Sequence, residues 1–410
     1  MLAERVVVLG GGFAGLETAF QLAAMVKPSR LHLTVVSDRD RFLYRPGLVA
    51  LPFGAAEAPL HVPLSQALDL HGIKRRLACV ENIDTDRRVV HTNRLAPVHY
   101  DHLVIATGAQ AHPHRVPGLA EHAVAISSPG QLHQLGERFQ WVAHNAGHGR
   151  PQQVLFVVPP NTAWPGPAYE IALMLDTWLR RREVRHQVGI TFATAERTFG
   201  EHLGEGLHHI LAGEFATRGI AGRTGLAVTE IAEVHTGFDD GTKVQHDLVV
   251  GVPPVAAAMW HDGMPADGRG FLTCRPADRS VLGQDGVYAP GDAGDFPVKQ
   301  AFLAVTQARA VATAIASRIL GRPAGTEYEP TALCVLDTVD KGILVEAPLT
   351  AEGLVRVDHD HVLTGPAWRA VKHAIGRYVP MRYRHGRPAL PRTGDGLLTA
   401  ARRLLGPIGR

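Results

Sequence analysis

The stretch that decides the fold is VVVLGGGFAG, residues 6–15. Its apolar start is typical of a short buried strand, and its glycines follow the G-x-G-x-x-G arrangement. Residues 13–25 then carry apolar side chains at helical spacing, and residues 31–36 form a second apolar run. The sequence therefore predicts a strand–helix–strand unit with parallel strands and a right-handed crossover.

The glycine turn has the properties of a pyrophosphate-binding turn. Gly10 permits the tight turn, Gly12 lets the backbone approach a phosphate, and Gly15 lets helix and strand pack closely. Phe13 and Ala14 open the helix, whose free N–H groups and positive dipole end favour an anion. We expect these five residues to bind a dinucleotide.

The ribose partner departs from the usual pattern, in which an acid follows the glycines by about 20 residues. Ser37 stands 22 residues after Gly15, and Asp38 comes next. Either Asp38 accepts the ribose hydroxyls one position late, or Ser37 hydrogen-bonds them instead. A solvated loop acid is the third interpretation of Asp38.

A second apolar run at residues 154–158 is followed by a helical pattern over 168–181 and another strand at 188–193. We therefore predict an α/β protein with two Rossmann-like dinucleotide-binding domains, the second inserted into the first, and a C-terminal region with amphipathic helices. The predicted bounds are 1–112 and 262–326 for the first domain, 113–261 for the second and 327–410 for the C-terminal region.

Composition excludes several classes of protein. Of 410 residues, 45% are hydrophobic and 20% charged, as in soluble globular chains, and no apolar run is long enough to span a membrane. A strand begins at Arg5, so no signal peptide is expected. Cys79, Cys274 and Cys334 show no metal-type spacing and no disulfide framework, which favours no metal site and a reducing cytoplasm. A net charge of +3 is too small by itself to indicate nucleic-acid binding.

The C-terminal tail is strongly basic. Residues 366–410 hold ten Lys/Arg and one acid, and they carry two apolar stripes at helical spacing. Such helices favour an anionic membrane surface, which would make the protein peripheral on the inner face of the cell membrane. The alternative is that they pack on the body or join a homodimer. The stripes are Trp368, Val371, Ile375 and Tyr378, and then Leu397, Ala401, Leu404, Leu405 and Ile408.

Two further motifs resemble those of two-dinucleotide-binding-domain flavoproteins: LVIATGA at residues 103–109 and VYAPGD at 287–292. The resemblance implies FAD as cofactor, with Asp292 on its ribityl chain. No cysteine lies near Tyr44 or Gln110 to form a thioether, so noncovalent FAD is expected. The implied cofactor-binding residues are Thr107, Gly108, Ala109, Gly291 and Asp292.

The second unit lacks a glycine cradle. Its turn reads PPNTAWPGP over residues 159–167. Prolines remove N–H donors, and Trp164 occupies space that a pyrophosphate would need. The sequence therefore predicts no tightly bound NAD(P)H.

A narrower resemblance follows from four segments: GPAYE at 166–170, GEHLG at 200–204, GDAGDFPVKQ at 291–300 and CVLD at 334–337. They resemble sulfide:quinone oxidoreductases and the flavoprotein subunits of flavocytochrome c sulfide dehydrogenases. The resemblance implies that Lys299 and Gln300 lie at the flavin and that Cys334 is a redox cysteine.

Four side chains are the catalytic candidates. Lys299 would stabilise negative charge on the reduced flavin. Glu170, expected in the first turn of its helix, would accept a donor's proton or only stabilise the helix end. His202 suits proton transfer. Cys334 would form a flavin adduct or take up sulfane sulfur if its pKa were lowered, or be inert packing.

The cysteine pair of that family is incomplete here, because no cysteine lies between Cys79 and Cys274 and Trp164 stands near the expected place. We predict an FAD-dependent oxidoreductase that passes electrons from a small sulfide- or thiol-type donor to a quinone-type acceptor. The alternatives are an NAD(P)H-dependent reductase, of type II NADH dehydrogenase or ferredoxin reductase kind, and a flavin-holding protein whose redox site has decayed.

Overall fold

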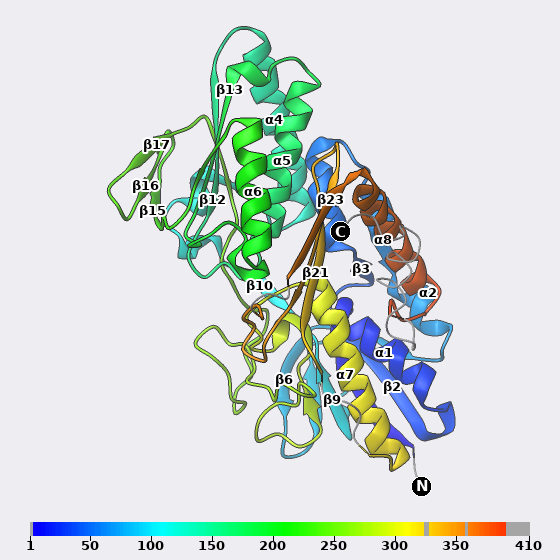
Figure 1. Ribbon diagram of the computed structural model, residues 1–410. Helices are drawn as coiled ribbons and strands as arrows, with labels where there is room; N and C mark the ends of the chain where they lie inside the picture. The colour runs from blue at the N-terminus through cyan, green and yellow to red at the C-terminus, as the bar shows by residue number, and fades with distance from the viewer. Residues whose placement is uncertain (1–2, 324–327, 357–359, 391–410) are drawn as a thin grey trace.

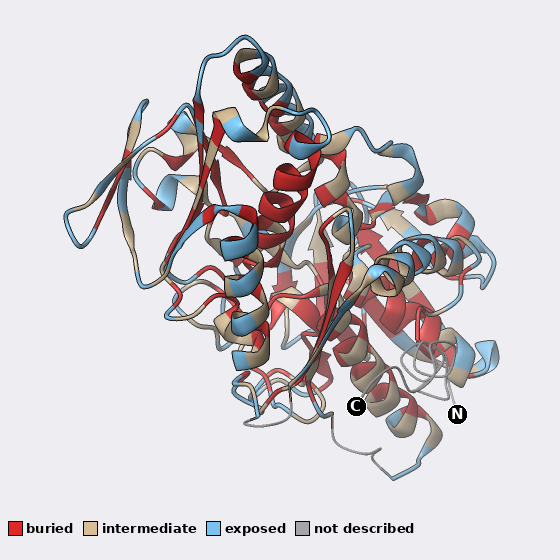
Figure 2. Ribbon diagram, turned by 45° about the horizontal axis from the view of Figure 1, so that its top comes forward, coloured by how far each residue is buried: buried red, intermediate tan, exposed pale blue. Residues whose placement is uncertain are grey.

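The computed structural model describes residues 3–323, 328–356 and 360–390. Two sheet-and-helix units lie one above the other in Figure 1, with the C-terminal strands and α8 beside their junction. Burial is concentrated in the sheets and in the helices that cover them (Figure 2).

The first unit is built on a five-stranded parallel sheet. Because side chains alternate along a strand, Val6 and Val8 face α1 and α7, whereas Val7 and Leu9 face a small antiparallel sheet. In spatial order the strands are β20 (Val287–Tyr288), β9 (His102–Ile105), β1 (Glu4–Leu9), β2 (Leu31–Ser37) and β5 (Lys74–Leu77), covered by α1 (Phe13–Met25) and α7 (Ala301–Leu320) on one side and by β6 (Val80–Asp84), β7 (Val89–Thr92) and β8 (Val98–His99) on the other.

The second unit repeats this plan. Val154, Phe156 and Val158 of β12 point into the larger core with the helices, and Leu155 and Val157 face another small sheet. Its parallel strands, in spatial order, are β11 (Ala123–Ala125), β18 (Leu248–Gly251), β12 (Gln152–Val158), β13 (Val188–Thr194) and β14 (Ile220–Arg223), with α4 (Pro129–Gly147), α5 (Gly166–Arg180), α6 (Glu205–Arg218) and the strands β15 (Val228–Ile231), β16 (His235–Phe238) and β17 (Lys243–Gln245).

Short elements complete the two units. An antiparallel pair, β10 and β19, joins the segments that run between them. The elements are β3 (Arg41–Leu43), β4 (His61–Pro63), α2 (Leu64–Asp69), β10 (Ala109–Ala111), α3 (Leu119–His122) and β19 (Val255–Ala257).

The C-terminal region contains a sheet that the sequence analysis did not predict. Strands β21 (Thr331–Asp337), β22 (Gly342–Pro348) and β23 (His361–Gly365) pair antiparallel and lead into α8 (Pro366–Arg384). Leu336, Ile343 and Val345 of this sheet join the core of the second unit. The sheet therefore closes the junction between the units.

Helix α8 is the first of the two predicted amphipathic helices; the second stripe, from Leu397 to Ile408, lies outside the described residues. Two basic residues of α8 bind carboxylates of other elements: Arg369 pairs with Asp337 of β21 at 3.0 Å, and Lys372 pairs with Glu170 of α5. These two cations are therefore engaged within the chain. Among the residues described, no helix is long and apolar enough to cross a membrane.

A buried carboxylate on α1 fixes the end of the described chain. Glu17 accepts hydrogen bonds from Ala389 N at 2.7 Å, Leu390 N at 3.2 Å and Tyr383 Oη at 3.1 Å. Gln21 donates to the same carboxylate at 2.9 Å. Because α1 also opens at the glycine turn, the segment after α8 is anchored to the helix that carries this turn.

Glu17→Ala is expected to destabilise the protein by about 2–4 kcal/mol, because it leaves buried N–H donors unpaired and opens a small cavity. The free energy of unfolding in guanidinium and the rate of tryptic cleavage at Arg382 and Arg384 test this. Glu137→Ala, on the exposed side of α4, is the control and should change neither. Unchanged cleavage in Glu17→Ala would contradict the anchoring role.

Candidate functional site

Each glycine of the first turn has a steric reason to be glycine. Gly10 has φ +110°, and a Cβ atom there would lie 2.2 Å from the Ala106 carbonyl oxygen. A Cβ at Gly15 would lie 2.0 Å from the Gly10 carbonyl oxygen, so close helix–strand packing requires glycine. At Gly12 a Cβ would meet nothing within 4 Å. The side of the turn that would face a phosphate is therefore open.

The end of β2 distinguishes between the two ribose candidates. Ser37 is buried, and its Oγ would lie 3.1 Å from a Cβ built on Gly11, so it borders the glycine turn. Ser37 Oγ donates to the Arg39 carbonyl at 2.8 Å. The Asp38 side chain is 58% exposed and pairs loosely with Arg39 at 3.7 Å. The geometry favours Ser37 as the ribose partner.

The A-T-G and G-D segments both reach this turn. Thr107, Gly108 and Ala109 directly follow Ala106, the residue that Gly10 abuts. Gly291 has φ +72°, and a Cβ there would lie 3.0 Å from the Cβ of Ala14 at the start of α1. Its N–H donates to Gln307 Oε1 of α7 at 2.7 Å.

Asp292 follows Gly291, and its half-buried carboxyl is near the cations of Lys299 and Arg45. Burial raises its pKa, and the charges of Lys299 and Arg45 oppose this shift. Burial lowers the pKa of Arg45, which Asp292 counteracts. Sequence reasoning missed Arg45, because it belongs to no glycine motif and simply begins the turn after β3.

Lys299 is held in place from three sides. Its Nζ donates to the Gly294 carbonyl at 2.5 Å and lies 3.8 Å from the ring centre of Phe271. Burial lowers the pKa of Lys299 to about 8, against the attraction of Asp292. Its backbone N–H donates to the Ala163 carbonyl of the second unit at 3.3 Å.

The side chain of Gln300 connects the same loop to the C-terminal sheet. Its Nε2 donates to the Leu333 carbonyl at 2.9 Å, and its Oε1 accepts from Leu333 N at 3.4 Å. Leu333 precedes Cys334 on β21. Loop 291–300 therefore contacts both the second unit and the strand of the candidate redox cysteine.

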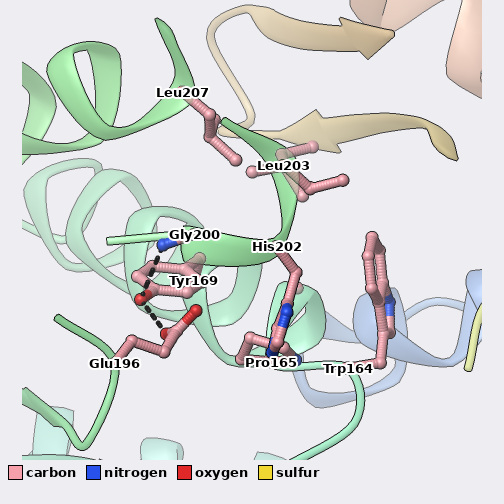
Figure 3. A pocket seen from close by; sticks show the side chains of 10 residues that line it. Trp164, Pro165, Tyr169, Glu196, Gly200, His202, Leu203 and Leu207 are labelled. Carbon is pink, nitrogen blue, oxygen red and sulfur yellow. Dashed lines mark hydrogen bonds between the residues drawn. The ribbon is translucent and has the colours of Figure 1, made fainter. Parts of the chain in front are cut away.

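The turn after β12 is closed, as its prolines and tryptophan predict. The indole of Trp164 packs so closely on Gly166 that a Cβ there would lie 2.9 Å from the ring. Figure 3 shows Trp164 and Pro165 beside His202, at the start of α5. Trp164 therefore fills the place where a phosphate would meet this helix.

Glu170 lies deeper than the sequence predicted. Helix α5 begins at Gly166, so Glu170 is the fifth residue and not part of the first turn. Lys372 Nζ of α8 and Asp337 N of β21 donate to its carboxylate, the latter at 3.0 Å. Burial raises the pKa of Glu170, while Lys372 lowers it. Sequence reasoning missed Lys372, since its position in the basic tail favoured a solvated or lipid-facing role.

Cys334 lies on β21 next to this ion pair. Burial raises the pKa of its thiol to about 12, with Lys372 lowering and Glu170 raising it. The thiol is therefore protonated at neutral pH in this structure. The hypothesis of a reactive Cys334 required a lowered pKa, whereas burial raises it. Cys274 is buried in the first unit and donates to the Leu272 carbonyl, and Cys79 is exposed.

His202 lies in the short turn η6 (Glu201–Leu203) and lines a pocket of about 10 Å³, enough for about one water molecule. Burial lowers the pKa of His202, and Glu201 opposes that shift. Leu336 of β21 also lines the pocket. Because residues i and i+2 share a strand face, Cys334 lies on the same face, about 7 Å along β21.

The structure thus groups the predicted residues into two adjacent clusters. Gly10–Gly15, Ser37, Asp292 and Lys299 belong to the first unit, around the carboxyl ends of its parallel strands, whereas the Asp38 side chain is mostly exposed. Cys334 and Glu170 lie at the C-terminal sheet, and His202 borders the nearby pocket.

Comparisons with known proteins agree with this arrangement. Residues 4–138 match the family described as pyridine nucleotide-disulphide oxidoreductase. The sulfide-quinone reductase of Aquifex aeolicus is 31% identical over 252 residues, which cover 60% of this chain but only 56% of that protein. An NADH dehydrogenase-like protein of Mycobacterium tuberculosis is 25% identical over 299 residues, covering 70% of this chain and 72% of that protein.

Among solved structures, the sulfide:quinone oxidoreductase of Aquifex aeolicus superposes with a TM-score of 0.86 at 24% identity, covering 97% of this chain and 95% of that one. These findings confirm the predicted fold class and the predicted resemblance to sulfide:quinone oxidoreductases.

Lys372→Met is expected to cost about 3–5 kcal/mol at neutral pH, because it leaves the Glu170 carboxylate buried without its cation. The pKa of Glu170 would rise further, so the loss should shrink as pH falls and the carboxyl protonates. Unfolding free energies between pH 5 and 8 measure this. The double variant Lys372→Met/Glu170→Gln should recover most of the loss, whereas additive losses would contradict the pairing.

Proposed function

We propose that this chain, which resembles sulfide:quinone oxidoreductases in sequence and fold, is an FAD-dependent oxidoreductase. It takes electrons from a small sulfide- or thiol-type donor and delivers them to a quinone-type acceptor. The FAD is bound noncovalently. The proposal depends most on the contrast between two turns. The glycine turn of the first unit is open at Gly12, whereas the turn after β12 in the second unit is closed by Trp164.

The residues around the glycine turn of the first unit fit FAD. Gly12 leaves the phosphate side open, and the free N–H groups at Phe13 and Ala14 suit the pyrophosphate. Ser37 serves the ribose and Asp292 the ribityl chain. We assign Arg45, Lys299 and Gln300 as residues that contact either the isoalloxazine ring or the phosphates of FAD. When bound, FAD supplies the two-electron redox chemistry that the side chains lack.

On the donor side, the chain offers one thiol and two proton acceptors. Addition of one hydrogen sulfide to the Cys334 thiol forms one S–S bond, breaks two S–H bonds and releases two protons and two electrons; bound FAD would be the oxidant that takes up the two electrons before they pass to the quinone. We assign Glu170 and His202 as the groups that accept the protons. Because the Cys334 pKa is about 12, the thiol must lose its proton to a base as it reacts.

An NAD(P)H-dependent reaction is the runner-up, since the chain also has NADH dehydrogenase-like relatives. The closed turn at Trp164 argues against it. The acceptor side is proposed at the C-terminal region, where the basic tail would bring the protein to the inner face of the cell membrane. A homodimer through the same region is the alternative use of that tail.

The direct test is the FAD content of the purified protein together with sulfide-dependent reduction of decylubiquinone. We expect one extractable FAD per chain and activity with sulfide. A flavin that dithionite reduces but sulfide and thiols do not would instead indicate a decayed redox site.

Cys334→Ala is expected to abolish sulfide-dependent flavin reduction, because Cys334 carries the thiol on β21, whereas Cys274 is buried with its thiol donating to the Leu272 carbonyl and Cys79 is exposed. Stopped-flow absorbance at the flavin band measures the rate. Cys79→Ala, an exposed thiol on another segment, is the matched control and should react like the parent chain. Equal rates for Cys334→Ala and the parent would make Cys334 a packing residue.

Lys299→Met is expected to lower the flavin reduction potential by about 30 mV or more, because a lost cation disfavours the anionic reduced form; 30 mV corresponds to about 1.4 kcal/mol for two electrons. Because the pKa of Lys299 is about 8, its amine becomes neutral as pH rises through 8. The difference in reduction potential between the parent and Lys299→Met should therefore decrease over that range. Dye-equilibrated redox titration measures both. Lys74→Met, exposed on β5, is the control, and a potential that Lys299→Met leaves unmoved would place Lys299 away from the flavin.

A further inference from the structure

Glu196 is a buried carboxyl at the end of β13 that no motif of the sequence singled out. It is 9% exposed. Its Oε2 accepts from Tyr169 Oη at 2.5 Å and from Thr194 Oγ1 at 2.8 Å, and its Oε1 accepts from Glu201 N at 3.1 Å. Tyr169 Oη in turn accepts from Gly200 N at 3.1 Å.

These bonds converge on the turn that carries His202. Gly200 and Glu201 immediately precede His202, and both of their backbone N–H groups bind the Glu196–Tyr169 pair. Figure 3 shows the chain of bonds from Gly200 through Tyr169 to Glu196, with the His202 ring on the other side of the turn facing Pro165 and Trp164.

The turn itself needs outside support. Gly200 has φ +67° and Gly204 has φ +97°, conformations that glycine adopts readily but that do not fix the loop. Tyr169 is rigid, because it stacks on Phe192 at 4.3 Å between ring centres and is almost fully buried. The rigid Tyr169 side chain and the Glu196 carboxylate, which accepts three hydrogen bonds, thus fix the first residues of the turn.

We propose that Glu196 is a positioning residue: through Tyr169 and the backbone of Gly200 and Glu201 it fixes His202 at the wall of the pocket beside β21. The inference rests on the proposed function, in which His202 accepts a donor proton. It adds a residue that acts through His202 and touches neither donor nor flavin.

The protonation state of Glu196 supports this role. Burial raises its pKa to about 7; the bonds from Tyr169, Thr194 and Glu201 N lower it, and the Glu201 carboxylate raises it. Above this pKa the carboxylate can accept all three bonds. Below this pKa the protonated carboxyl carries its own O–H, which competes with one of the three donors. The turn then loses a hydrogen bond. Because hydrogen sulfide also titrates near neutral pH, the diagnostic quantity is the ratio of the parent rate to the Glu196→Gln rate, which should fall on the acid side of about pH 7.

Four variants test the proposal in stopped-flow reduction of the holoenzyme by sodium sulfide. Displacing a catalytic group by about 1 Å costs up to about 10²-fold, so Glu196→Gln should slow reduction about 10-fold or more above about pH 7, and this loss relative to the parent should shrink below that pH. His202→Gln should slow it about 10²-fold. The double variant should be no slower than His202→Gln alone, since both act through one group. Glu205→Gln, which removes an exposed carboxyl at the start of α6, is the matched control and should react like the parent.

Histidine ¹³C NMR of the holoenzyme separates this inference from the proposed function. The His202 signal, identified by its loss in His202→Gln, should shift in Glu196→Gln and stay in place in Glu205→Gln. If Glu196→Gln does not fold, Tyr169→Phe breaks the same link and should give the same pattern. Additive rate losses or an unmoved His202 signal would overturn the positioning role. A shifted signal with no rate loss in His202→Gln would support the positioning and overturn His202 as proton acceptor.

Discussion

Free backbone N–H groups at the start of a helix are what a dinucleotide pyrophosphate binds, and the two Rossmann-like units differ in this one property. In the first unit the turn is open at Gly12, and the half-buried carboxyl of Asp292 lies next to Gly291, which contacts Ala14 at the start of α1. In the second unit Trp164 covers the corresponding helix start. We therefore propose that this duplicated architecture provides one nucleotide site and that the second unit builds the other wall of the reaction site.

That wall is made where three segments distant in sequence meet. The Ala163 carbonyl accepts from Lys299 N, Gln300 binds Leu333, and Lys372 binds Glu170. Each contact joins a different pair of regions, so loop 291–300, β21 and α8 are fixed relative to one another. The cost of burying Glu170 and Lys372 is offset only while both are present. The basic tail thus contributes structure to the junction in addition to any role at a surface.

The sequence was most informative where backbone geometry constrains residue type. Gly10 and Gly15 could be assigned because no other residue fits, and Trp164 because its bulk and its proline neighbours exclude a phosphate. Side chains defined by long-range packing could not be found in this way. Arg45 and Lys372 lie in no motif, and Glu196 gains its role only when β13 and α5 bring it to Tyr169. The sheet β21–β22–β23 was missed because its strands pack on a distant core. The thiol pKa of Cys334 likewise depends on burial that local sequence does not reveal.

The most direct measurement is anaerobic reduction of the FAD-loaded protein by sulfide and by NADH in parallel, each at stoichiometric concentration and followed by flavin absorbance. With one open and one closed nucleotide turn, sulfide should bleach the flavin rapidly and NADH should leave it oxidised over the same period. Rapid bleaching by NADH would contradict the account, because it would require a nucleotide site where the turn after β12 is closed.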